Sequence, residues 1–200
     1  YSNDFSIWDL ESVNHYKDQT DIFFTCHEFS YNKIAEAYEP YLGLIRQMFH
    51  KYCSGTLEEF MEECDVYKLQ RPVFESYFEN GFCERTEQIL IDEVEYEQER
   101  MRNSIVTMLQ KLSEIRPVVI VLNRFQLASK STMQLTNRLL QTKNKNIGIV
   151  LGVNDVQSIP EFAHEEWDAI CESMDDRNMV YHSGNAGRNM EPDVMDYYSD

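Results

Sequence analysis

The sequence predicts an α/β fold of three layers, in which a mostly parallel sheet carries helices on both faces. The first observation behind this prediction is the run Val-Val-Ile-Val-Leu at 118–122, which is β-branched and typical of a strand buried on both sides. A second run of this kind occupies 146–153. Strand and helix patterns alternate over 118–182, as expected of parallel strands joined by helical crossovers.

The first elements of the chain are a helix, a strand and a second helix. Residues 6–17 have apolar side chains at helical spacing, and the β-rich run Asp-Ile-Phe-Phe-Thr-Cys at 21–26 predicts a strand. One apolar face then extends over 31–52, which predicts a helix that is interrupted at Pro40.

Start and stop signals follow this helix. Thr56 is a suitable N-cap, because acidic residues occupy the first turn after it. Residues 57–80 predict one or two short helices, which are broken near Pro72 and end at Gly81. The glycine is expected to stop the helix, since it follows an asparagine at the end of the apolar pattern.

The remaining elements complete the order. A helical pattern without Pro or Gly runs over 85–115, so we expect a helical insertion around 55–115. Further helices are predicted over 131–140 and 161–174, and a third buried strand over 178–182. The last strand would continue the alternation that is typical of a parallel sheet.

Composition and charge limit the classes of function. The chain of 200 residues is 42% hydrophobic and fits one domain with its own core, expected over 1–183 and followed by an acidic tail or linker over 184–200. A net charge of −17 argues against binding to nucleic acid or to an anionic membrane. No apolar run is long enough to cross a bilayer, no secretory signal is visible, and the odd number of five cysteines suits reduced thiols. We therefore expect a cytoplasmic protein.

Several segments match, in order, the strands and helices of one known family. They are Asp-Ile-Phe-Phe-Thr-Cys at 21–26, Ala-Tyr-Glu-Pro-Tyr-Leu-Gly-Leu-Ile at 37–45, residues 118–140 with Ala128 and Ser131, and residues 147–155. This order resembles the nucleotide-binding domain of P-loop ATPases of the AAA and STAND type, with 118–140 similar to the Walker B strand and its helix. The resemblance implies a P-loop-NTPase-like module in a multidomain bacterial signalling protein, ahead of helical repeats or an output module such as a diguanylate cyclase.

The chain departs from this family at the nucleotide site. It contains no Gly-x4-Gly-Lys-Ser/Thr loop, whose backbone amides and lysine hold phosphate groups. At the Walker B position Asn123 replaces the acid, and Arg124 adds a cation where Mg²⁺ would lie. These losses favour a non-catalytic regulatory or protein-interaction domain without a cofactor. The alternative is an active ATPase, binding ATP and Mg²⁺, whose phosphate loop lies upstream of Tyr1.

Polar residues at the predicted strand ends suggest a third hypothesis. Asn123 and Arg124 follow one buried strand, while Asn154 and Asp155 follow the next one. Ligands bind at the carboxyl ends of strands in open α/β sheets, so these residues could form the pocket of a small-ligand sensor. In the structural alternative, they only cap the strands and turn the chain.

Other clusters invite a metal or a partner. Cys26 and His27 could join His50 and Cys53 in a zinc site, but neighbours on a strand point to opposite faces, which favours a buried thiol and a surface imidazole. Acidic and aromatic residues gather in the helical insertion. The acidic residues are Glu58, Glu59, Glu62, Glu63, Asp65, Glu93, Glu95, Glu97 and Glu99; the aromatic ones are Tyr67, Phe74, Tyr77, Phe78 and Phe82. Both clusters, if exposed, favour a protein partner or self-association.

Overall fold

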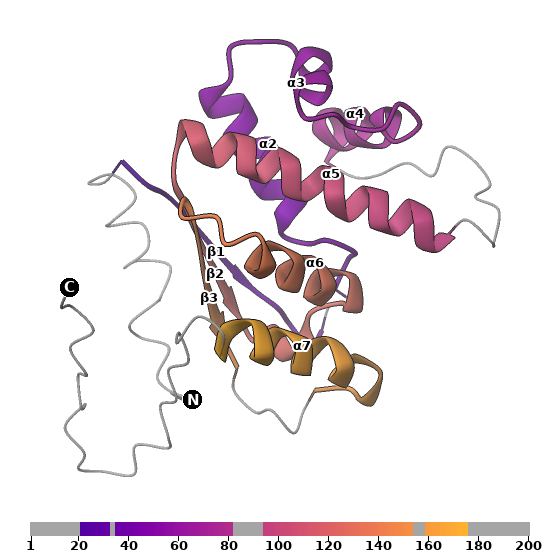
Figure 1. The fold of residues 1–200 in the computed structure, drawn as a ribbon, viewed down its shortest axis with the longest axis vertical. Coiled ribbons are helices and arrows are strands. Elements are labelled where there is room, and N and C mark those ends of the chain that lie inside the picture. Colours follow the sequence, from indigo (N-terminus) through magenta and orange to yellow (C-terminus); the bar gives the residue numbers. More distant parts are fainter. Residues whose placement is uncertain (1–20, 33–34, 82–93, 154–158, 176–200) are drawn as a thin grey trace.

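The computed structural model describes residues 21–32, 35–81, 94–153 and 159–175. They form a sheet of three parallel strands in the order β1-β2-β3, with helices beside it (Figure 1). The strands are β1 (Phe23–Glu28), β2 (Val118–Asn123) and β3 (Ile147–Gly152). The helices are α2 (Tyr41–Tyr52), α3 (Leu57–Glu63), α4 (Arg71–Asn80), α5 (Val94–Ile115), α6 (Lys130–Gln141) and α7 (His164–Asp175), with short 3₁₀ turns η3 (Phe125–Leu127) and η5 (Glu161–Ala163).

The sheet confirms the strands predicted at 21–26, 118–122 and 146–153, and it confirms that they run in parallel. The register places Phe23 beside Val118, and Val118 beside Ile147, so side chains alternate between the two faces in step across all three strands. The central strand β2 is the most deeply buried of the three, which agrees with its continuous apolar sequence.

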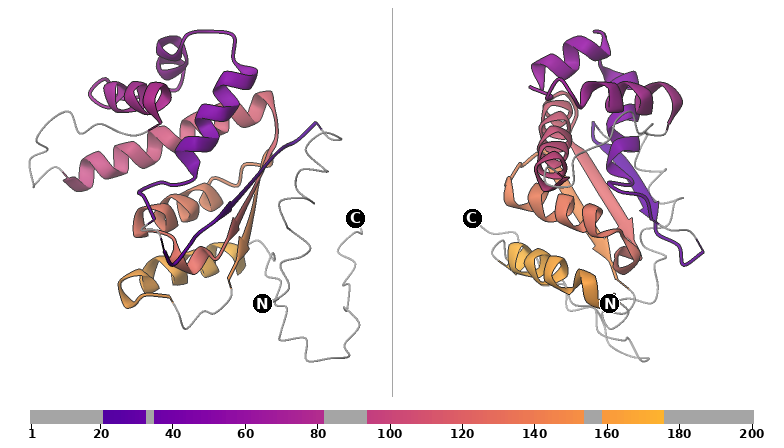
Figure 2. Two further views of the ribbon diagram at one scale, coloured as in Figure 1. Left: turned by 180° about the vertical axis from the view of Figure 1, so that it is seen from behind. Right: turned by 90° about the vertical axis from the view of Figure 1, so that its right-hand side faces the viewer.

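Helices lie on one side of the sheet in the described part of the chain (Figures 1 and 2). Ile120 and Leu122 of β2 belong to the same buried core as Ile45 of α2 and Leu109 of α5. The strand order β1-β2-β3 means that both connections step across the sheet in the same direction. Connections between parallel strands are almost always right-handed, and two right-handed connections that step the same way place their helices on the same face. The described residues thus form an α/β structure that supplies two of the three expected layers.

The helix expected over 31–52 begins only at Tyr41. Pro40 is its N-cap residue, and Tyr38 before it has a left-handed backbone with φ of 61°. A proline has no backbone N–H and its ring collides with a preceding helical turn, so a helix can begin after Pro40 but cannot run through it. The prediction of helix before Pro40 was therefore wrong for residues 31–32 and 35–39, which the structure describes.

The helical insertion starts and stops largely where the sequence predicts. Thr56 Oγ1 accepts a hydrogen bond from the Glu59 N–H at 3.2 Å, and Glu59 Oε2 accepts one from the Thr56 N–H at 2.9 Å, forming a capping box. Gly81 ends α4 with a left-handed φ of 81°. Residues 57–80 form two short helices with a break at 64–70, near Pro72 as predicted. Pro72 itself lies in the first turn of α4, where no N–H is needed.

Some predictions fall on residues outside those described. They concern the helix at 6–17, the first residues of the helix at 85–115, the strand at 178–182 and the tail at 184–200. Among the helices that the structure does describe, none combines the length and the apolar character needed to cross a membrane.

Buried hydroxyl groups join the chain before α2 to helix α6. Tyr41 is fully buried, and its hydroxyl lies 2.6 Å from Thr136 Oγ1. Thr136 donates its own hydrogen to the carbonyl oxygen of Thr132 at 2.8 Å, so Tyr41 must be the donor in their mutual bond. One turn earlier, Thr132 Oγ1 donates to the carbonyl oxygen of Glu39 at 3.0 Å. The start of α2 is therefore fixed on α6 by polar bonds within an apolar core.

Replacing Tyr41 by Phe should lower the free energy of unfolding by about 1 kcal/mol at neutral pH, since Thr136 loses a buried donor. Burial raises the pKa of the Tyr41 hydroxyl above its ordinary value of 10.0. A raised pKa stabilises the fold below pH 10.0, and this contribution falls as the pH rises further, because the unfolded phenol ionises first.

Urea denaturation at neutral pH and above pH 10.0 measures both effects. Tyr41→Phe should lose less stability than the native chain over this interval, while Tyr96→Phe, whose side chain is 71% exposed, should behave like the native chain. Equal stability of the native chain and Tyr41→Phe at neutral pH would contradict the proposed role of the bond.

Candidate functional site

The carboxyl end of β2 carries the two residues that the sequence singles out. Asn123 is the last residue of the strand, and its Nδ2 lies 3.6 Å from Sγ of Cys26 on β1. Arg124 follows with a left-handed φ of 54°, and its Nε lies 3.2 Å from Oε1 of Glu28. Glu28 pairs with Asn123 in the strand register, so the cation is held directly at the end of the sheet. The other two residues of the predicted pocket, Asn154 and Asp155, lie outside the described residues.

The ion pair between Arg124 and Glu28 lies at the surface. The two side chains are 38% and 57% exposed, so the pair contributes at most about 1 kcal/mol to stability. A non-glycine residue with a left-handed backbone costs a similar amount. The arrangement is therefore not explained as a gain in stability. Its consequence is electrostatic, because it places a guanidinium group at the carboxyl end of the central strand.

Cys26 and His27 point to different neighbours, as predicted for adjacent strand residues. The Cys26 thiol contacts Asn123, whereas the His27 ring packs against Phe29 with ring centroids 4.6 Å apart. Burial, followed by the charge of Glu28, raises the pKa of the Cys26 thiol, which makes it a poor nucleophile at neutral pH. Within the described ranges, no three or more His, Cys, Asp or Glu side chains are placed to hold a metal ion, so His50 and Cys53 do not complete the zinc site considered above.

Gln126, in the turn η3, was missed by the sequence analysis. Its side chain is fully buried, and neither Oε1 nor Nε2 has a hydrogen-bond partner in the part of the chain that the structure describes. Its neighbour Phe125 packs between Phe29 and Trp167, which encloses the turn on both sides. A single glutamine in a three-residue turn gives no sequence signal of burial, so only the structure identifies it.

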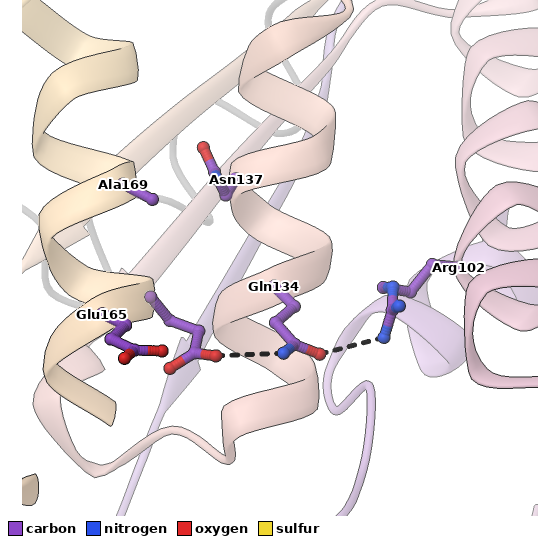
Figure 3. Close-up of a pocket in the computed structure, with 6 residues that line it drawn as sticks. Arg102, Gln134, Asn137, Glu165 and Ala169 are labelled. Atoms are coloured by element: carbon purple, nitrogen blue, oxygen red, sulfur yellow. Dashed lines mark hydrogen bonds between the residues drawn. The ribbon is translucent and has the colours of Figure 1, made fainter. Parts of the chain in front are cut away.

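A cavity of about 290 Å³ lies where α5, α6 and α7 meet (Figure 3). Its walls are formed by Arg102, Gln134, Asn137, Glu165, Glu166 and Ala169. A chain of hydrogen bonds crosses it: Arg102 Nη1 donates to Gln134 Oε1 at 2.9 Å, and Gln134 Nε2 donates to Glu166 Oε1 at 3.0 Å. The residues therefore join three helices that lie far apart in the sequence.

The charged residues at both ends of this series of hydrogen bonds, Arg102 and Glu166, also have oppositely charged partners. Glu99 accepts two hydrogen bonds from Arg102, which hold the pKa of its carboxyl below the ordinary value. Burial raises the pKa of Glu166, but hydrogen bonds from Lys130 and Gln134 outweigh this effect and lower it overall. Both carboxyls are ionised at neutral pH, so neither is a general acid there. We interpret the residues of the cavity wall as structural contacts that hold α5, α6 and α7 together.

The aromatic stretch of the insertion is divided between core and surface. Phe74 and Phe78 are buried, whereas Tyr67 is 41% exposed and Leu69 near it is 70% exposed. Phe82 lies outside the described residues. The acidic residues of α3 and of the turn after it are all exposed, as the sequence predicts for a solvated helix face. The exposed part of the stretch thus lies beside an acidic surface.

Comparison with known proteins supplies no assignment. No family model matches the sequence, and neither the curated proteins nor the solved structures include a significant match. The interpretation of this chain therefore rests on its own residues and geometry.

The amide of Gln126, which has no partner among the described residues, leads to a prediction about stability. Gln126→Met, which keeps the length of the side chain and removes both polar atoms, should raise the free energy of unfolding by about 1–3 kcal/mol. Gln70 supplies a matched control, because it is also buried but its amide donates to Glu97 and accepts from Ser104. Gln70→Met should therefore lower stability.

Urea denaturation of the native chain and of the two variants provides the measurement. A loss of stability in Gln126→Met comparable to that in Gln70→Met would contradict the prediction and would mean that the Gln126 amide has a partner in solution, such as a buried water molecule.

Proposed function

We propose that this chain is a non-catalytic regulatory or protein-interaction domain on a P-loop-ATPase-like α/β scaffold, as part of a signalling protein. The observation that carries the proposal is the end of β2, where Asn123 and Arg124 stand and Arg124 Nε lies 3.2 Å from Glu28 Oε1. The parallel order of β1, β2 and β3 is compatible with such a scaffold. The bacterial signalling context comes from the sequence resemblance alone.

The electrostatics of the strand end support the loss of catalysis. An amide at position 123 carries no charge to hold the water shell of Mg²⁺, and a guanidinium at position 124 repels a divalent cation. The nearest described carboxylate on the neighbouring strand, that of Glu28, is already paired with this guanidinium. Without the metal, a transferring phosphoryl group would lack the cation that bridges the phosphate oxygens in phosphoryl transfer.

The acidic character of the chain supports interaction with proteins over interaction with nucleic acid. Its net charge of −17 would repel a phosphate backbone, but it would attract and orient a basic protein. The competing hypothesis is an active ATPase whose phosphate loop is encoded upstream of Tyr1. In that case Arg124 would have to lie beside bound nucleotide and not only beside Glu28.

The purified chain should release no phosphate from ATP in the presence of Mg²⁺, and isothermal titration calorimetry with Mg²⁺ and ATP should give no binding heat. The same two measurements on a chain extended by the residues encoded upstream of Tyr1 separate the hypotheses. Mg²⁺-dependent hydrolysis by either chain would contradict the proposal. Arg124→Ala is the matched variant, and it should also be inactive if the site is not catalytic.

A further inference from the structure

The loop between α3 and α4 presents apolar side chains to solvent although it is firmly anchored. Val66 and Gln70, at its two ends, are 2% and 3% exposed, whereas Leu69 between them is 70% exposed. The Gln70 amide donates to the backbone oxygen of Glu97 at 3.1 Å and accepts from Ser104 at 3.1 Å. The exposure of Leu69 is therefore imposed by a loop that is fixed on α5.

The first turns of α5 extend the same surface. The guanidinium of Arg100 lies over the Tyr67 ring, 4.3 Å from its centroid. Tyr96 precedes Arg100 by four residues, so the two side chains are neighbours on the helix, and Tyr96 is 71% exposed. Tyr67 and Leu69 therefore belong to the loop that contacts α5 at Arg100, and Tyr96 lies one helical turn before Arg100. We call Tyr67, Leu69 and Tyr96 the exposed aromatic–leucine face.

The surroundings of this face are acidic. The exposed acids of α3 and its following turn precede it in the chain, and they are Glu58, Glu59, Glu62, Glu63 and Asp65. Glu95 and Glu97 flank Tyr96 on α5. Three basic groups lie in or beside the face: Lys68 is exposed in the loop itself, Arg71 donates to the Val66 carbonyl, and Arg100 pairs with Glu97 at 2.7 Å. They are outnumbered by these acids. Negative charge therefore predominates around the apolar side chains.

We propose that the exposed aromatic–leucine face binds a basic segment of another protein, one that carries apolar side chains between its lysines or arginines. Tyrosine and leucine side chains supply the apolar contact, and the surrounding carboxylates attract and orient the positive charges. The inference rests on the proposed interaction function and names the chemistry of the partner. A second copy of this chain is a poor occupant, because its net charge of −17 would repel an identical molecule.

A labelled helical peptide of lysine and leucine, with leucines along one side, is the probe, and fluorescence anisotropy measures its binding to the purified chain. Leu69→Ser and Tyr96→Ser should each weaken binding about tenfold, and raised salt should weaken binding by the native chain. Tyr31→Ser is the matched control: Tyr31 is 69% exposed but lies after β1, away from the face, so binding should not change. A peptide with glutamate in place of lysine should not bind.

Each outcome decides the inference. Equal binding by the native chain, Leu69→Ser and Tyr96→Ser overturns it, and so does the absence of binding. Association of the chain with itself that Leu69→Ser abolishes, as seen by analytical ultracentrifugation, would assign the face to a second copy and also overturns it. Circular dichroism and urea denaturation confirm that the variants fold. Phosphate release from ATP is measured separately, so failure of the non-catalytic proposal and failure of this inference are distinguishable.

Discussion

The fold depends on the hydrogen bonds that α6 makes to the chain leaving β1. The Tyr41 hydroxyl donates to Thr136, Thr132 donates to the Glu39 carbonyl at 3.0 Å, and Ser129 donates to the Glu36 carbonyl at 3.2 Å. Tyr41 and Thr136 are buried, and a buried hydroxyl without a partner costs more than a formed bond returns, so this pair above all specifies the path of the chain. That path sets where α2 starts, and α2 in turn packs on α5 and covers the sheet (Figure 1).

On the opposite side of α6, hydrogen bonds to charged side chains take the place of bonds between neutral hydroxyl groups. There Gln134 connects Arg102 of α5 with Glu166 of α7 across an open cavity, and both charged groups have further partners. Three of the lining residues, Arg102, Gln134 and Glu166, are already bonded to each other, which leaves fewer donors and acceptors for a ligand. The end of the sheet differs, because Arg124 adopts a strained backbone there and its exposed ion pair returns little stability. This contrast makes the strand end the more informative site.

Elements that depend on residues close together in the sequence could be predicted. Elements that depend on contacts between distant parts of the chain could not. The strand at 118–122 follows from its continuous apolar run, and the capping box at Thr56 follows from residues three positions apart. The absence of helix over residues 35–40 depends on Pro40 and on carbonyl groups that bond to α6, which lies over ninety residues further along the chain. Periodicity within a single segment carries no information about such partners, so tertiary contacts override it.

The candidate sites illustrate the same limit, because burial decides the meaning of a polar residue. Gln70 and Gln126 are both buried glutamines in short irregular segments, yet Gln70 is satisfied by Glu97 and Ser104 while Gln126 has no partner among the described residues. The bonded glutamine has a further effect: by fixing its loop on α5 it forces Leu69 outward. Because hydrogen bonds already fix this loop, a binding partner would not have to order its backbone. A mobile loop would lose conformational entropy on binding. The same hydrogen bonds that hold the helical insertion on α5 therefore also fix the surface to which we propose that a partner binds.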